Sequence, residues 1–274
     1  MKLSKLAAAL ATTVALSVAG SAYAVPSITN VDGTLTPFGG IDWHGSAAAW
    51  TTGFGAGAVG TNFTIQYAAW ATGLNQLGSG TLTTPGLDND ANGVANAGKT
   101  YEYTTFNTIQ ATVISSGGGN FVYQITGGAF NIYYDTTPDA NAPTGAWTGF
   151  QDGVSIISGT YDAGQFGAFL GFLGTNALGL TGTVTTTNLT YVNPALAGMS
   201  ISSTLQLFPA TQNSFSPPTT VEGFVVDKVN ESLFQADSNQ AFIVARVPEP
   251  ASLLIVGTAL AGLGFASRRR NKTA

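Results

Sequence analysis

The sequence predicts an all-β body, an antiparallel β-sandwich or jelly-roll-like fold, with an apolar helix at each end of the chain. Between the ends, short runs of alternating apolar and polar residues recur, and Gly, Asn, Asp or Pro interrupts each run. Only 8% of the 274 residues are charged, so the charged helix formers typical of surface helices are scarce. Thr, Val, Ile and aromatic residues, which favour strands, are abundant instead.

The first element is a predicted signal helix over residues 1–24. Lys2 and Lys5 precede an apolar run over residues 6–18, and small residues follow, ending in Ala22-Tyr23-Ala24. A basic start, an apolar middle and an A-x-A-like end are typical of a secretory signal peptide. We therefore expect the secretion machinery to export the chain and cleavage to follow Ala24.

The exported body is predicted to span residues 25–246. Without any cysteine it cannot form disulfides, but its length is sufficient for a hydrophobic core. Turn residues at 115–119 and 127–128 predict a three-stranded meander, and long polar loops are expected at 73–100 and 136–152. We expect strands over 46–52, 61–70, 101–114, 120–126, 129–135, 154–161, 165–173, 182–192, 199–208, 221–227 and 241–246.

The body is acidic once the two ends are set aside. Within residues 25–250 only Lys99, Lys228 and Arg246 are basic, against all fourteen acidic residues, which gives a net charge of −11. Nucleic-acid binding needs a basic surface, so the body is not expected to bind nucleic acid. An acidic surface is instead compatible with cations.

One loop resembles the start of a calcium site. Asp88, Asp90 and Asn92 alternate and Gly93 follows, as in the opening of a calcium-binding loop. The twelfth position, where a bidentate Glu is expected, holds Lys99. The stretch therefore predicts either a solvated turn or a looser calcium site that Asn96 or Glu102 completes. The oxygen-rich segment 135–141 is a second, weaker candidate.

The sequence offers little for catalysis. The only histidine is His44, with Asp42 two residues before it, and no nucleophile elbow is present. Two carboxylates about 5–10 Å apart are sufficient for a glycosidase, so a polysaccharide hydrolase is an alternative. Most of the acidic residues lie in turns, where Asp is expected for backbone reasons. We therefore expect a protein without catalytic residues.

Aromatic residues leave a glycan-binding module as a further alternative, because aromatic faces stack on sugar rings. Trp147 lies in a Gly- and Thr-rich loop and is the tryptophan that we expect to be exposed. The other tryptophans are expected to fill the core and to form cross-strand pairs.

The chain ends in three consecutive parts. Pro248 and Pro250 flank Glu249 and hold the backbone extended. An uncharged apolar run over residues 251–267 follows, close to the minimum length for a transmembrane helix. The basic residues after it favour the cytoplasmic side, so the body is expected to lie across the membrane. These basic residues are Arg268, Arg269 and Arg270.

This end, residues 247–274, resembles the PEP-CTERM sorting signal of exported bacterial proteins. The resemblance implies that the chain sits in the inner membrane transiently and that an exosortase acts near Pro248-Glu249-Pro250. It also implies delivery to the outer surface or extracellular matrix of a Gram-negative bacterium that makes an exopolysaccharide. A C-terminal anchor that stays uncut is the alternative.

The body is also similar to flocculation-associated PEP-CTERM proteins in two segments, residues 37–43 and residues 233–239. That resemblance implies a structural or adhesive role, together with exopolysaccharide, in flocs or biofilms. It implies no catalytic residue. No cofactor is expected, with calcium as the one possible exception.

Overall fold

A computed structural model describes residues 25–142, 145–170, 176–210, 215, 217–226 and 232–243, and residues 25–244 form one compact unit. The described residues form strands, turns and loops without a helix, so the all-β prediction is confirmed. None of them belongs to a helix with the length and hydropathy needed to cross a membrane. The predicted signal peptide and the predicted C-terminal helix lie outside the described residues.

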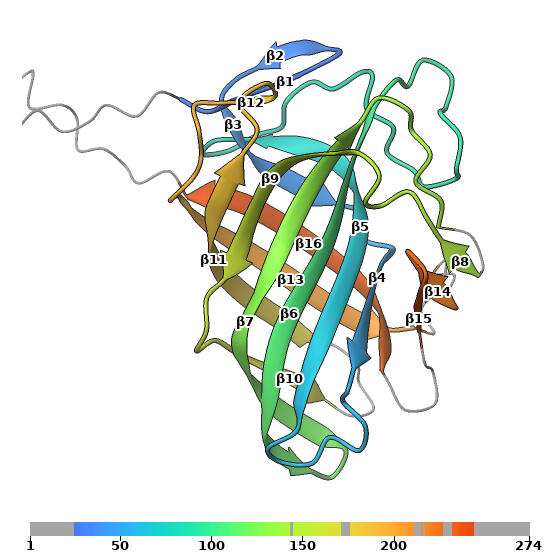
Figure 1. Ribbon diagram of the computed structural model, residues 1–274, viewed down its shortest axis with the longest axis vertical. Helices are drawn as coiled ribbons and strands as arrows, with labels where there is room; N and C mark the ends of the chain where they lie inside the picture. Colours follow the sequence, from blue (N-terminus) through green and yellow to red (C-terminus); the bar gives the residue numbers. More distant parts are fainter. Residues whose placement is uncertain are drawn as a thin grey trace, which may run out of the picture. The chain divides into compact units, whose positions relative to one another are not determined.

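The strands follow one another along the body, joined by short turns and by long loops such as residues 77–101 (Figure 1). They are β1 (Ser27–Asn30), β2 (Gly33–Leu35), β3 (Phe38–Trp43), β4 (Ala47–Thr52), β5 (Asn62–Gln76), β6 (Glu102–Gly117), β7 (Asn120–Asp135), β8 (Ala146–Trp147), β9 (Val154–Tyr161), β10 (Phe166–Leu170), β11 (Asn176–Thr187), β12 (Val192–Asn193), β13 (Ser200–Pro209), β14 (Thr220–Val221), β15 (Phe224–Val225) and β16 (Leu233–Ile243).

Ten of these strands form one antiparallel sheet that closes on itself. The order runs β7-β6-β5-β3-β16-β13-β11-β9, and β9 then pairs with β7. Strands β3 and β4 pair with successive parts of β5 and β16, and β9 and β10 pair with successive parts of β7. The ten strands therefore occupy eight positions around the closed sheet, which Figure 1 shows curling until its ends meet.

This closed sheet differs from the predicted sandwich or jelly roll, in which two sheets stack face to face. The reason lies in the connections. Around the closed sheet, each position pairs with the position that follows it in the chain, and the last strand, β16, pairs with β3 and β4 near the start. The long crossover connections of a jelly roll are therefore not needed.

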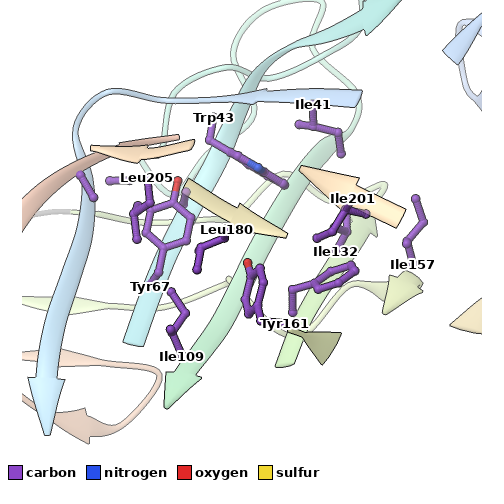
Figure 2. Close-up of a cluster of buried hydrophobic side chains, with 14 of the residues drawn as sticks. Ile41, Trp43, Tyr67, Ile109, Ile132, Ile157, Tyr161, Leu180, Ile201 and Leu205 are labelled. Atoms are coloured by element: carbon purple, nitrogen blue, oxygen red, sulfur yellow. The ribbon is translucent and has the colours of Figure 1, made fainter. Parts of the chain in front are cut away.

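The main core fills the inside of the closed sheet. Every second residue of the long strands points inward, as in β5, where Phe63, Ile65 and Tyr67 are buried. Trp43 on β3 and Tyr161 on β9 point into the same core (Figure 2). Large side chains from both sides of the ring meet in the centre.

The hairpin of β6 and β7 corrects one detail of the prediction. The turn expected within 115–119 is confirmed, with Gly118 and Gly119 at φ values of 59° and 79°. The expected turn at 127–128 was wrong, because both glycines lie inside the continuous strand β7. A Cβ atom on Gly128 would lie 2.3 Å from the carbonyl oxygen of Thr108, so glycine is there to let β6 approach closely.

A second apolar cluster lies on the outer face of the closed sheet. Alternate residues of β4 and β5, including Trp50 and Trp70, point outward and are nevertheless buried. Residues from the segment 140–150 and from β14 cover them. In this cover, β14 pairs in parallel with β8 and antiparallel with β15. We call this cluster and its covering segments the outer cap.

A third, small sheet has the order β12-β1-β2. Its register pairs Ser27 with Asn193 and Ile28 with Leu35. Ile28 and Val192 of this sheet are fully buried and belong to the main core. The start of the body is thereby fixed to the segment that follows β11.

Candidate functional site

Three carboxylates come together at the edge of the outer cap. Oxygen atoms of Asp135, Asp139 and Asp152 all lie within 4.8 Å of one another. Asp135 ends β7, and the other two lie in the loops on either side of β8. We call these residues the acidic trio. Carboxylate oxygens at this spacing are the ligands that a hard cation such as Ca²⁺ prefers.

A buried glutamate positions part of this trio. Glu102 at the start of β6 is 1% exposed. Its Oε1 atom accepts hydrogen bonds from the backbone N–H groups of Asp139 and Ala140, both at 3.0 Å. Burial raises the pKa of Glu102 to about 7, although these two hydrogen bonds lower it. The segment that carries Asp139 is therefore attached to the sheet through a carboxyl group that titrates near neutral pH.

The electrostatics of the trio follow from burial and like charge. Burial raises the pKa of Asp139, and the carboxylates of Asp152 and Asp135 raise it further. Glu222 lies close by and accepts a hydrogen bond of 2.6 Å from the backbone N–H of Phe150. Burial likewise raises the pKa of Glu222. The region thus favours proton or cation uptake.

The predicted calcium loop is closed by its own side chains. The amide group of Asn96 donates a 3.0 Å bond to Asp88 and a 2.7 Å bond to Asp90. Asp88 is 2% exposed and also accepts a bond from the backbone N–H of Asn96. Asn92 accepts from the backbone N–H of Val94 instead. Asn96 closes the loop by donating hydrogen bonds to both carboxylates.

The prediction that Trp147 is exposed was wrong. Its side chain is 1% exposed and stacks on Phe150 with the ring centres 5.7 Å apart. It also meets Trp70 edge to face at 6.0 Å. The Gly- and Thr-rich loop folds back over the outward-facing aromatic residues of the sheet, so its tryptophan is part of a core. Buried in this way, the ring offers no face to a sugar.

His44 is placed as a structural residue. Its ring stacks on Trp70 with the centres 4.5 Å apart, and its Nδ1 atom accepts the backbone N–H of Ser46 at 3.0 Å. Burial lowers the pKa of His44. Asp42 accepts bonds from Thr72 and Asn239 instead of orienting the imidazole. These contacts differ from those of a catalytic triad, in which the histidine bonds to a nucleophile on one side and to an orienting carboxylate on the other.

Sequence reasoning missed the contribution of Asp152 to the acidic trio and the hydrogen bonds by which Glu102 holds the backbone at Asp139. The oxygen-rich composition of the segment 135–141 does indicate a candidate site, and the segment supplies two of the three carboxylates. Asp152 comes from beyond the next loop, and no spacing rule connects it to Asp135. The pairing of β7 with β9, which starts at Tyr134 and Val154, brings the two residues together.

The comparisons with known proteins concern the C-terminal end. The family model described as the PEP-CTERM protein-sorting motif matches residues 246–270. The chain carries a PEP-CTERM sorting motif. No curated protein and no solved structure matches the chain. The predicted resemblance of residues 247–274 is thereby confirmed, and it implies an exported protein that an exosortase processes.

In the sequence, the PEP-CTERM match starts three residues after the last described strand. The last described strand, β16, pairs with β13 as far as Ile243, and the match starts at Arg246. Only residues 244 and 245 therefore separate the last described strand from the matched segment in the sequence.

Proposed function

We propose that this PEP-CTERM protein is a non-enzymatic structural and adhesive protein of the outer surface or extracellular matrix of a Gram-negative bacterium. It associates there with exopolysaccharide and contributes to floc or biofilm formation. The observation that carries the proposal is the sorting motif immediately after the last strand of the body. Once the motif has been removed, the β body is the whole working molecule.

The composition of the body supports the same role. Only 8% of the residues of the whole chain are charged, and residues 25–250 carry a net charge of −11. Because few side chains are charged, most of the surface suits contact with a neutral polysaccharide, whereas the acidic net charge makes copies of the body repel one another. The two segments that are similar to flocculation-associated proteins meet at one residue pair, Asp42 with Asn239, whereas residues 233–236 pair with β4.

The sorting part is tested by intact mass. The protein is recovered from the matrix and from the membranes of its own host and weighed. We expect matrix protein that starts at Val25 and ends near Pro250. A variant with Ala at Pro248, Glu249 and Pro250 should stay in the membranes, whereas Thr273→Ala, outside the matched residues, should behave like the wild type. Full-length wild-type protein found only in membranes would refute the proposal.

The role of the body is tested separately with the polysaccharide of the host. We expect retention of the protein on immobilised polysaccharide and loss of flocs in a strain that lacks the protein. The non-enzymatic part is tested by incubating protein and polysaccharide and measuring new reducing ends. Steady release of reducing ends would identify a hydrolase instead, and Asp135, Asp139 and Asp152 would be the first residues to replace.

A further inference from the structure

A pocket of about 290 Å³ lies where β3 and β16 meet the turn that follows β5. Asn239 and Ala241 of β16 line one side of it, and their side chains are exposed. Asn75 and residues 76–80 line the other side. Ligand pockets start at roughly 300 Å³, so this pocket is of a size for a small ligand or for one unit of a polymer.

The lining of this pocket is polar and uncharged. Asn75, Gln76 and Asn239 are the amide residues among those that line it, and none of the described lining residues carries a charge. An amide both donates and accepts hydrogen bonds, as a hydroxyl group does. An anion would need a basic residue and a metal ion would need carboxylates. The lining therefore matches a neutral ligand rich in hydroxyl groups.

The wall opposite β16 is held in place before any ligand arrives. The backbone N–H of Gln76 donates to the carbonyl oxygen of Gly80 at 2.9 Å, and that of Leu77 donates to Pro37 at 3.0 Å. A Cβ atom on Gly39 would lie 2.4 Å from the backbone nitrogen of Leu77, so only glycine allows this approach. A wall that is already ordered costs less entropy when a ligand binds.

The amides of the pocket are only partly used by the protein. Asn239 donates one bond to Asp42 at 3.3 Å, and Gln76 donates one bond to the carbonyl oxygen of Thr81 at 3.2 Å. Each amide has two N–H groups and an oxygen with two acceptor sites. Both side chains are therefore oriented by one bond and keep further bonding capacity for a ligand.

We propose that this pocket binds one neutral sugar unit of a polysaccharide, through the amides of Asn75, Gln76 and Asn239. This inference rests on the proposed function and assigns it a place on the body. It puts sugar contact on the outer face beside β16 rather than at the buried Trp147. It also assigns a use to the segments that form β3 and β16, which pair at the floor of the pocket.

The test uses the purified full-length chain and neutral oligosaccharides of glucose, galactose and mannose, with binding followed by saturation-transfer NMR and calorimetry. We expect Asn239→Ala to weaken binding about three- to tenfold, which is the effect of one lost hydrogen bond. Ala241→Phe should fill the pocket and abolish binding. Gln206→Ala is the matched control, because Gln206 is an exposed amide on β13 outside the pocket.

The outcomes separate this inference from the proposed function. If Ala241→Phe and Asn239→Ala leave binding unchanged, the proposal that this pocket binds the sugar is refuted. Retention on the host polysaccharide without binding of any neutral oligosaccharide also overturns it, while the proposed function stands. If the wild type binds neither, both proposals fail. Should Ala241→Phe fail to fold, Asn239→Ala still decides, because its exposed side chain is not part of a core.

Discussion

The two apolar clusters of this protein are built from opposite faces of the same strands, yet they are held together differently. Inside the closed sheet, core residues come from every position around the ring, and long ladders of hydrogen bonds fix them. In the outer cap, Trp50 and Trp70 come from the sheet, but their cover consists of loops and of strands two residues long. The comparison teaches that burial alone does not decide how a region will unfold.

The outer cap depends on a few polar contacts. The indole N–H of Trp70 donates to the carbonyl oxygen of Asn89 at 3.1 Å, and carboxylates of Glu102 and Glu222 bind backbone N–H groups of the cover. A region with few ladder bonds can open while the rest stays folded. We therefore expect the cap to be the less stable of the two regions.

The largest effect is expected in the main core. Trp43→Ala removes a side chain that is 2% exposed from the centre of the closed sheet. We expect a loss of about 3–5 kcal/mol in the free energy of unfolding, because a large cavity remains in a place that cannot collapse. Urea unfolding followed by far-UV circular dichroism measures this loss. A loss below about 1 kcal/mol would show that the ring of strands, rather than its filling, stabilises the body.

Trp147→Ala sharpens the contrast, since the two tryptophans are equally buried. We expect a smaller loss, under about 3 kcal/mol, because the cap can detach without opening the closed sheet. Hydrogen exchange should then become fast at Phe150 and Val221 and stay slow at Ile109. Equal acceleration at all three amides would mean that cap and closed sheet unfold as one unit.

Glu102→Gln should remove a pH dependence from the stability of the outer cap. The pKa of Glu102 is raised from 4.5 to about 7, so the folded protein binds a proton that the unfolded chain has lost. This stabilisation is complete below about pH 4.5 and is lost as pH rises through 7, a fall on the order of 2 kcal/mol. The variant should keep the bonds to Asp139 and Ala140 and remove this fall. Melting temperatures of both proteins from pH 5 to pH 8 test it, and parallel curves would contradict it.

The smallest effect is expected in the loop 88–96. Asn96→Ala removes the amide that donates to Asp88 and Asp90, and leaves two carboxylates facing each other. We expect a loss of about 1–2 kcal/mol, confined to the loop and to the Trp70 contact beside it. Asn92→Ala is the control, because Asn92 is exposed and should cost less. Thermal unfolding with and without calcium also tests whether the freed carboxylates then take up a cation.

The sequence predicts the strands of this fold better than their assembly. Alternation in 61–70 and 101–114 is a local property and identifies most of β5 and β6, although β5 continues to Gln76, into the stretch expected to be a loop. Closure of the sheet depends on strand pairings such as Ala129 with Thr160 and Ile41 with Gln240. Neither partner segment shows, by its own sequence, which strand it will pair with. The outer cap also buries outward-facing residues of β4 and β5. Where it covers them, these strands lack the alternation of apolar and polar residues that is typical of a strand with one face in water.

The functional residues also differ in how far the sequence alone can identify them. The sorting motif is linear, so its residues could be identified without coordinates. The acidic trio and the pocket beside β16 join segments that are distant in the chain, and only the folded sheet brings them together. Trp147 was misplaced because a loop rich in Gly and Thr gives no sign of the aromatic surface on which it will pack.

Closure of the sheet also bears on what happens when many copies accumulate in one place. The long strands β5, β6, β7, β13 and β16 have hydrogen-bonded neighbours on both sides, so their backbones offer no template for a further strand. Such a body resists conversion into cross-β fibres even though it is poor in charge. Copies of the body would therefore meet through side chains rather than by adding strands to the closed sheet.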